Sequence, residues 1–249
     1  MKPLHFSYRA GLAFLGAATL ITPAVAFDEN EKQEIGEIVR EYLLANPELL
    51  GEVQEVLEER AAAEEELARV AIIQSAQDQL LRDPADPVLG NPDGDVTVVE
   101  FFDYNCGFCR RAMADMQTII ESDANVRFVL KEFPILGPES IAAHQVALAF
   151  NKLMPEKYGE FHIQLMEFEG RADEGSAIEV ALGLGIDEAR LRETMADPTL
   201  SNSVQSTYEL AEGLGIGGTP SYVIGDSLVP GALGVDELRA RIAEVRAAN

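Results

Sequence analysis

Hydrophobic positions in the first part of the chain repeat at helical spacing. Ile35, Ile38 and Tyr42 lie three or four residues apart, which predicts an amphipathic helix. Asn46-Pro47 then has the order of a helix start, a capping side chain followed by a proline at the first helical position. Beyond it the apolar positions step by four and three residues, close to a heptad seam. The pattern predicts a second, much longer helix over residues 47–81.

These two helices make residues 27–82 an acidic helical stalk. Residues 28–82 carry 15 acidic and five basic side chains, so the segment is too long and too charged to be absorbed into a small core. We expect its apolar seam to pack against copies of the same chain, which gives a homo-oligomer through the N-terminal helices. The alternative is a seam that folds back onto the chain's own second domain.

The pattern changes after residue 82. Residues 83–95 hold three prolines and two glycines, which predicts a linker or a region of turns. Residues 96–102 and 126–133 have the apolar composition of buried strands, and the segment 106–121 between them has the period of a helix. Two strands joined by a helix predict a parallel pair with a right-handed crossover.

The remaining elements complete an α/β arrangement. Residues 140–212 predict several helices and no strand. Residues 221–226 and 227–231 predict a pair of strands that turns at Gly225, and residues 235–248 predict a last amphipathic helix. The fold class is therefore α/β, preceded by the helical stalk.

The first 26 residues have the order of a cleavable signal peptide. The positively charged residues Lys2 and Arg9 precede an apolar run at residues 11–21, and Ala24 and Ala26 occupy the positions that a signal peptidase reads. A membrane anchor is the alternative, but the run is short for a bilayer and a cleavage pattern follows it. We therefore expect export, and the periplasm if the source is Gram-negative, where disulfides form and persist.

The charge of the chain limits its partners. The formal net charge is −24, and cleavage of the first 26 residues would make it more negative by two. Such a charge argues against nucleic acid or an anionic membrane surface as a partner. The length fits one ordinary domain with an appendage.

The only two cysteines, Cys106 and Cys109, lie where the helix after the first strand begins. Unpaired backbone N–H groups and the helix dipole favour a thiolate at this place. The sulfurs lie one turn apart and can meet. We expect Cys106 to be the nucleophile and the more buried Cys109 to be the resolving thiol.

Other uses of the two thiols are less well supported. A zinc site normally needs four ligands, and neither His144 nor His162 has motif spacing to the cysteines, so we expect both histidines in the core. A structural disulfide across so short a loop would contribute only about 2 kcal/mol. A copper-binding or copper-delivery protein that uses the two thiols as soft ligands remains an alternative of a different class.

The sequences "EFFDYNCGFC" and "GGTPSYVIG" resemble the DsbA-like branch of the thioredoxin superfamily. The resemblance covers residues 96–249 and implies a thioredoxin-like fold with a helical insertion at about residues 138–212. It also implies that Pro220 is a cis-proline beside the active site and that Thr219 offers backbone groups to a bound peptide. Gly107 and Phe108, between the cysteines, would contact the substrate.

Glu100 lies on the first strand, six residues before Cys106. In the DsbA-like pattern an acid at this place lies below the disulfide and helps to move its proton. Its neighbours are apolar, so we expect a buried carboxylate with a raised pKa. Lys131 on the neighbouring strand is a candidate charge partner, the alternative being a lysine exposed to solvent.

Two features of the sequence favour an isomerase or reductase over an oxidase. DsbA-like oxidases often carry a histidine at the second position between the cysteines, and Phe108 has no hydrogen-bond donor, so we expect a less oxidising couple. The stalk is similar to that of suppressor-of-copper-sensitivity C proteins, and several catalytic domains on one stalk favour isomerisation. We therefore expect an isomerase or reductase of protein substrates, without a cofactor, served by a membrane redox partner. A dithiol oxidase is the alternative.

Overall fold

The computed structural model describes residues 27–248, and the predicted signal peptide lies outside them. The chain divides into two units between Glu59 and Arg60. None of the helices in the described part is long and apolar enough to cross a membrane.

The first unit consists of helix α1 (Glu29–Ala45) and the first part of helix α2 (Glu48–Ser75). Asp28 caps α1, because its carboxylate accepts the N–H groups of Asn30 and Glu31. Both helices lie where the apolar spacing predicts them, but the second ends at Ser75 and does not continue to residue 81. No residue of α1 is buried, and its apolar side chains are strongly exposed, with Ile38 at 65%. The stripe is thus an unpartnered apolar surface.

The last turns of α2 belong to the second unit. Ile73 of α2, together with Leu80 of the short helix α3 (Gln77–Leu81), is buried in one core with Phe101 and Val129 of the sheet. The boundary between the two units therefore lies inside α2, whereas the sequence placed a linker at residues 83–95. That segment also forms a short strand, β1 (Val88–Gly90).

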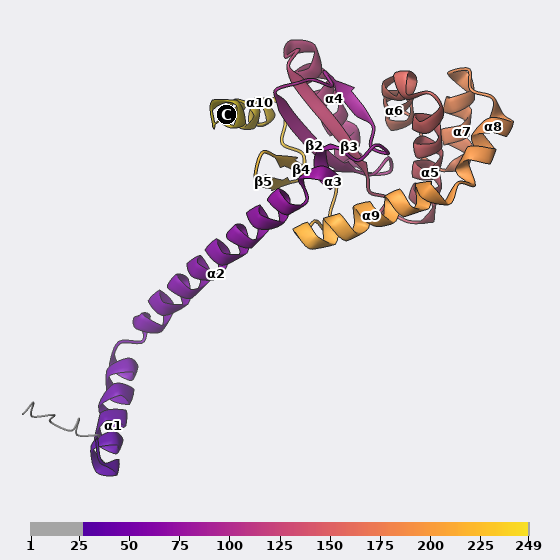
Figure 1. The fold of residues 1–249 in the computed structure, drawn as a ribbon. Helices are drawn as coiled ribbons and strands as arrows, with labels where there is room; N and C mark the ends of the chain where they lie inside the picture. The colour runs from indigo at the N-terminus through magenta and orange to yellow at the C-terminus, as the bar shows by residue number, and fades with distance from the viewer. Residues whose placement is uncertain (1–26, 249) are drawn as a thin grey trace, which may run out of the picture. The chain divides into compact units, whose positions relative to one another are not determined.

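A five-stranded sheet in the order β1-β3-β2-β4-β5 forms the centre of this unit (Figure 1). Strands β2 (Val96–Phe102) and β3 (Val126–Glu132) are parallel, as the strand-helix-strand pattern predicts. Strands β4 (Ser221–Ile224) and β5 (Ser227–Pro230) are antiparallel and turn at Gly225, which has a φ of 60°. Strands β1 and β5 are the two edges.

Helices cover both faces of the sheet. Helices α4 (Gly107–Ser122) and α10 (Val235–Ala248) pack on one face. The end of α2, α3 and helix α9 (Pro198–Leu214) pack on the other. Since β2 is buried along nearly its whole length, its carboxyl end is held firmly where α4 begins.

The chain between β3 and β4 is a helical block, as the resemblance implied (Figure 1). Its helices before α9 are α5 (Pro138–Leu153), α6 (Tyr158–Met166), α7 (Glu174–Gly183) and α8 (Glu188–Met195), with a 3-10 turn at Pro155–Lys157. The described part is thus a mixed α/β fold with a helical block inserted between two strands.

Candidate active site

Cys106 is the N-cap residue of α4, directly after the turn that leaves β2. Its own N–H donates to the carbonyl oxygen of Asp103 at 2.9 Å, which closes that turn. The side chain lies at the edge of the core and is 7% exposed, whereas Cys109, one helical turn later, is fully buried. A reacting partner thus has access to one thiol and not to the other.

The surroundings of the two sulfurs separate their acidities. A hydrogen bond from Cys109 lowers the pKa of Cys106 to about 5, helped by the Thr219 side chain and by the backbone N–H groups of Cys109 and Phe108. Burial raises the pKa of Cys109, and the bond to Cys106 raises it further. At neutral pH the pair therefore consists of one thiolate and one thiol, which suits a nucleophile with a resolving partner.

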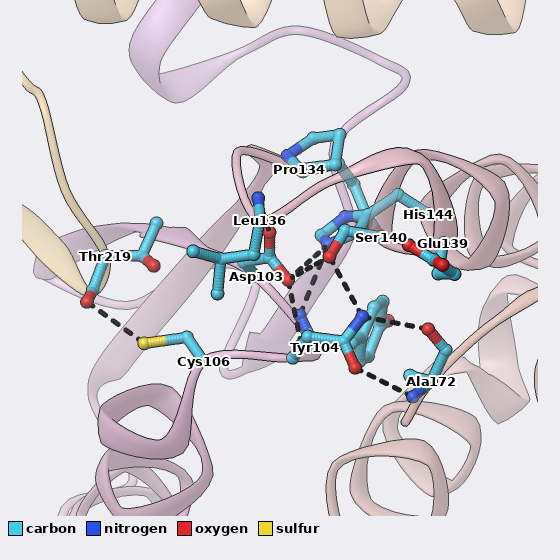
Figure 2. A network of polar contacts seen from close by, with 12 residues as sticks. Asp103, Tyr104, Cys106, Pro134, Leu136, Glu139, Ser140, His144, Ala172 and Thr219 are labelled. Atoms are coloured by element: carbon cyan, nitrogen blue, oxygen red, sulfur yellow. Dashed lines mark hydrogen bonds and ion pairs between the residues drawn. The ribbon is translucent and has the colours of Figure 1, made fainter. Parts of the chain in front are cut away.

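Thr219 lies against the Cys106 thiol, although it is 113 positions further along the chain (Figure 2). In its protonated form the Cys106 thiol donates to the carbonyl oxygen of Thr219 at 3.1 Å. The Thr219–Pro220 peptide bond is cis, as the resemblance implied. The structure thus brings the two motifs together at one point.

A groove of about 640 Å³ runs past this point. Its walls include Arg69 from α2, Phe108, and the chain from Gly215 to Ser221 before and at the start of β4. Phe108 is 58% exposed, and the guanidinium carbon of Arg111 lies 4.4 Å from its ring centroid. A Cβ on Gly107 would meet nothing within 4 Å, so the space beside Gly107 is open.

Glu100 is buried on β2, at 3% exposure, opposite Tyr222 of β4. Burial raises the pKa of its carboxyl group to about 8, while a hydrogen bond from Tyr222 lowers it and the charge of Cys106 raises it. A carboxylic acid that is largely protonated at pH 7 and coupled to both thiols can hold or accept a proton there.

Lys131 does not pair with Glu100 and is not exposed. In the parallel register Lys131 lies beside Phe101, so it points to the opposite face of the sheet from Glu100. There it is 2% exposed, forms an ion pair with Asp86 and donates to the carbonyl oxygen of Gln79. Burial raises the pKa of Asp86 to about 7 in spite of this pair.

His144 and His162 lie in the core, as expected, but they belong to a buried polar cluster that the sequence did not reveal. The Nδ1 atom of His144 contacts the carboxylate of Glu132, and its Nε2 atom lies 3.9 Å from Oδ1 of Asp103. The hydroxyl of Tyr158 donates to the Glu132 carboxylate at 2.6 Å. Burial alone would lower the pKa of His144, but the two carboxylates raise it. Burial, together with the charge of His144, lowers the pKa of His162 to about 3.

The described residues contain no group of three or more histidine, cysteine or acidic side chains that could hold a metal ion. The thiols of Cys106 and Cys109 are thus without further ligands of these kinds close by. What the arrangement supplies chemically is an activated thiolate, a second thiol in reach of it, and a buried acid.

Known proteins match both parts of the chain. The family model "DSBA-like thioredoxin domain" matches residues 97–243, and the model "Copper resistance protein ScsC N-terminal domain" matches residues 31–64. A solved thioredoxin-like oxidoreductase from Silicibacter pomeroyi is 45% identical and covers 69% of this chain and 98% of its own, with a TM-score of 0.66.

Two further relatives extend the likeness. Proteus mirabilis ScsC in a transitional conformation is 30% identical, covers 90% of this chain and 99% of its own, and has a TM-score of 0.66. The "Disulfide bond formation protein D" of Bacillus subtilis is 26% identical over 166 residues, which is 63% of this chain and 75% of that protein. The Proteus match spans the helices before the sheet as well as the sheet itself.

Proposed function

The chain belongs to the DSBA-like thioredoxin domain family and is a thiol–disulfide oxidoreductase, and we propose that it acts after export as an isomerase or reductase of protein disulfides. The observation that carries the proposal is the pairing of an accessible thiol of low pKa, Cys106, with a fully buried thiol of high pKa, Cys109. Only a thiolate attacks a disulfide at a useful rate.

The proposed reaction begins when the Cys106 thiolate attacks one sulfur of a substrate disulfide. A mixed disulfide forms, and the other substrate sulfur leaves as a thiolate that takes up a proton. In isomerisation a different substrate thiolate attacks the substrate sulfur of the mixed disulfide. A new substrate disulfide forms, Cys106 leaves as a thiolate, and no electrons are transferred overall. In reduction the Cys109 thiol loses its proton, with the deprotonated fraction of Glu100 as the proposed acceptor, and attacks Cys106. The substrate then leaves with two thiols and the enzyme holds the Cys106–Cys109 disulfide.

The choice of isomerase over oxidase has two supports. The pKa of Cys106, at about 5, lies between the values of about 3.5 for a strong oxidant and about 7 for thioredoxin. The side chain of Phe108 has no donor that would stabilise the thiolate further. A membrane reductase would return the disulfide to the dithiol in this role, and the signal-peptide pattern and the family favour the periplasm as the location.

Self-association through α1 and the first part of α2 is the second part of the proposal. Its support is the exposed apolar stripe, with Ile38, Leu44 and Leu50 all at least 59% exposed, and the family match over residues 31–64. Several thiol pairs on one assembly can engage a misfolded chain at more than one cysteine. This would raise the probability that a wrong disulfide is attacked again before the substrate leaves.

The decisive measurement combines the reduction potential of the Cys106–Cys109 couple with reactivation of scrambled ribonuclease. We expect a moderately oxidising couple and clear reactivation, which Cys106→Ser abolishes. A strongly oxidising couple without reactivation would instead identify a dithiol oxidase. Tight, stoichiometric copper(I) binding without disulfide exchange would identify the copper-binding alternative.

The role of the stalk is tested by removing residues 27–59 and no more, because Ile73 and Leu80 are part of the core of the second unit. Light scattering should give several copies for the exported chain and one for the shortened chain. We expect the shortened chain to keep insulin reduction and to lose ribonuclease reactivation. A single copy before truncation would contradict the oligomer.

A further inference from the structure

The turn that carries Cys106 is tied to the helical block by side chains outside the redox pair. Asp103, the last residue before the turn, accepts the N–H of Asn105 at 2.8 Å and the hydroxyl of Ser140 at 2.8 Å through the same oxygen. Its second carboxylate oxygen accepts the N–H of Leu136 at 3.0 Å. Figure 2 shows Asp103 between the thiol and α5, where Ser140 lies.

Asn105, directly before Cys106, makes a denser set of contacts. Its side-chain amide donates to the carbonyl oxygen of Ala172 at 2.8 Å and to the Ser140 hydroxyl at 2.9 Å. Its side-chain oxygen accepts the N–H of Ala172 at 2.8 Å. Both donor hydrogens and the acceptor oxygen are thus used, so these partners fix the orientation of the amide. The Asn105 amide thus pairs with both the N–H and the carbonyl oxygen of Ala172, as the backbone of a neighbouring strand would.

Arg110 fastens the same loop from the other side of the turn. Its guanidinium donates to the carbonyl oxygens of Tyr104 at 3.1 Å, Phe168 at 2.9 Å and Gly170 at 3.0 Å. The loop between α6 and α7 therefore lies across the Cys106 turn, held at Phe168, Gly170 and Ala172. No sequence motif indicates these bonds, since they join positions about 60 residues apart.

We propose that Asn105 is a positioning residue, whose bonds to Ala172 and Ser140 hold the Cys106 sulfur where the first N–H groups of α4 and the second thiol can stabilise its charge. This rests on the proposed function, in which that thiolate is the nucleophile. The physical reason is that hydrogen bonds to a thiolate weaken steeply with misalignment. A turn with Asn105 unanchored samples positions in which the sulfur loses these donors.

The test replaces Asn105 with alanine in the full exported chain and follows thiolate absorbance at 240 nm against pH in the reduced protein. We expect the pKa of Cys106 to rise by about one unit, equivalent to a tenfold lower acid dissociation constant. Asn151→Ala is the matched control, because Asn151 is also half-buried and also donates to a backbone carbonyl, that of Ala85 at 3.2 Å, away from the thiols. It should leave the titration unchanged.

Urea unfolding of both variants separates positioning from stability alone. If Asn105→Ala lowers stability but titrates like the wild-type chain, Asn105 is only structural and the inference is wrong. If Asn105→Ala does not fold, Asn105→Ser decides, because it removes the bonds to Ala172 and Ser140 and leaves the Ser140–Asp103 bond in place. A rise in the pKa of Cys106 supports the inference and no rise overturns it. Because the titration needs no substrate, it gives this answer even if the wild-type chain fails to exchange disulfides, which would refute the proposed function.

Discussion

The low pKa of Cys106 makes the stability of the reduced chain depend on pH in a way that can be calculated. The folded thiol titrates at about 5, against a reference value of 9.0. Because the folded pKa is the lower one, the folded state holds fewer protons between these values. The thiol's contribution to stability is therefore complete above pH 9 and is lost as the pH falls through 5.

The size of this contribution follows from the same two values. At pH 7 the thiolate stabilises the folded chain by about 2.7 kcal/mol, and at pH 5 by about 0.4 kcal/mol, at about 1.36 kcal/mol for each pKa unit. Cys106→Ser removes the titration. The difference in the free energy of unfolding between the reduced wild type and this variant should thus grow by about 2.3 kcal/mol from pH 5 to pH 7. Glu100, with a pKa of about 8, remains largely protonated over this window.

Urea unfolding followed by circular dichroism in excess reductant measures this difference, since the chain has no tryptophan. Cys109→Ser is the control: the pKa of Cys109 is raised, so it does not ionise in this range, and serine keeps a donor for the Cys106 sulfur. The control should retain the pH dependence of the wild type. The reasoning would be refuted if the difference in the free energy of unfolding between the wild type and Cys106→Ser did not change between pH 5 and pH 7.

Three further changes test other parts of the site. Because Glu100 has a raised pKa of about 8, its ionisation should lower the free energy of unfolding by about 3 kcal/mol between pH 4 and pH 7. Glu100→Gln should remove this decrease, and an equal dependence of the free energy of unfolding on pH in both chains would contradict this. Lys131→Met should cost about 3–5 kcal/mol at pH 9, where Asp86 would be a bare buried carboxylate, and less at pH 6, where it takes up a proton. Adding Asp86→Asn should remove that pH dependence, and a cost that does not vary with pH would show that the ion pair is not responsible. Phe108→His should lower the pKa of Cys106 and make the couple more oxidising by about 30 mV for each pKa unit, measured against glutathione; an unchanged potential would show that this position does not tune the thiol.

The main elements were predictable because their patterns are strong. The apolar runs of β2 and β3, the helix between them and the turn at Gly225 all have clear local signals, and the structure has them. Strand β1 was missed because three residues among prolines have no periodicity. The apolar seam of α2 was found, but spacing alone does not say what covers it, and Ile73 packs on the sheet whereas Val53 is 54% exposed.

The site residues that belong to short motifs could be predicted from the sequence, whereas the contacts that depend on the tertiary fold could not. Cys106, Cys109 and the Thr219-Pro220 pair came from short motifs, and the structure brings them together. Lys131 was assigned the wrong surroundings because the register of two strands decides which face a side chain occupies. Asp103 and Asn105 lie inside the motif, and a pair of such residues before a helix is a known turn signal, but their partners on the helical block could not be inferred.

Both edges of the sheet are short, β1 with three residues and β5 with four, and β5 ends at Pro230, which has no N–H to donate. An unfolded client brings many unpaired backbone groups, and a long open edge would let it add itself as a further strand and stay. These edges offer only a few ladder bonds. In the proposed function an unfolded substrate would therefore be held mainly at the groove beside the thiols, and the short sheet edges would favour its release.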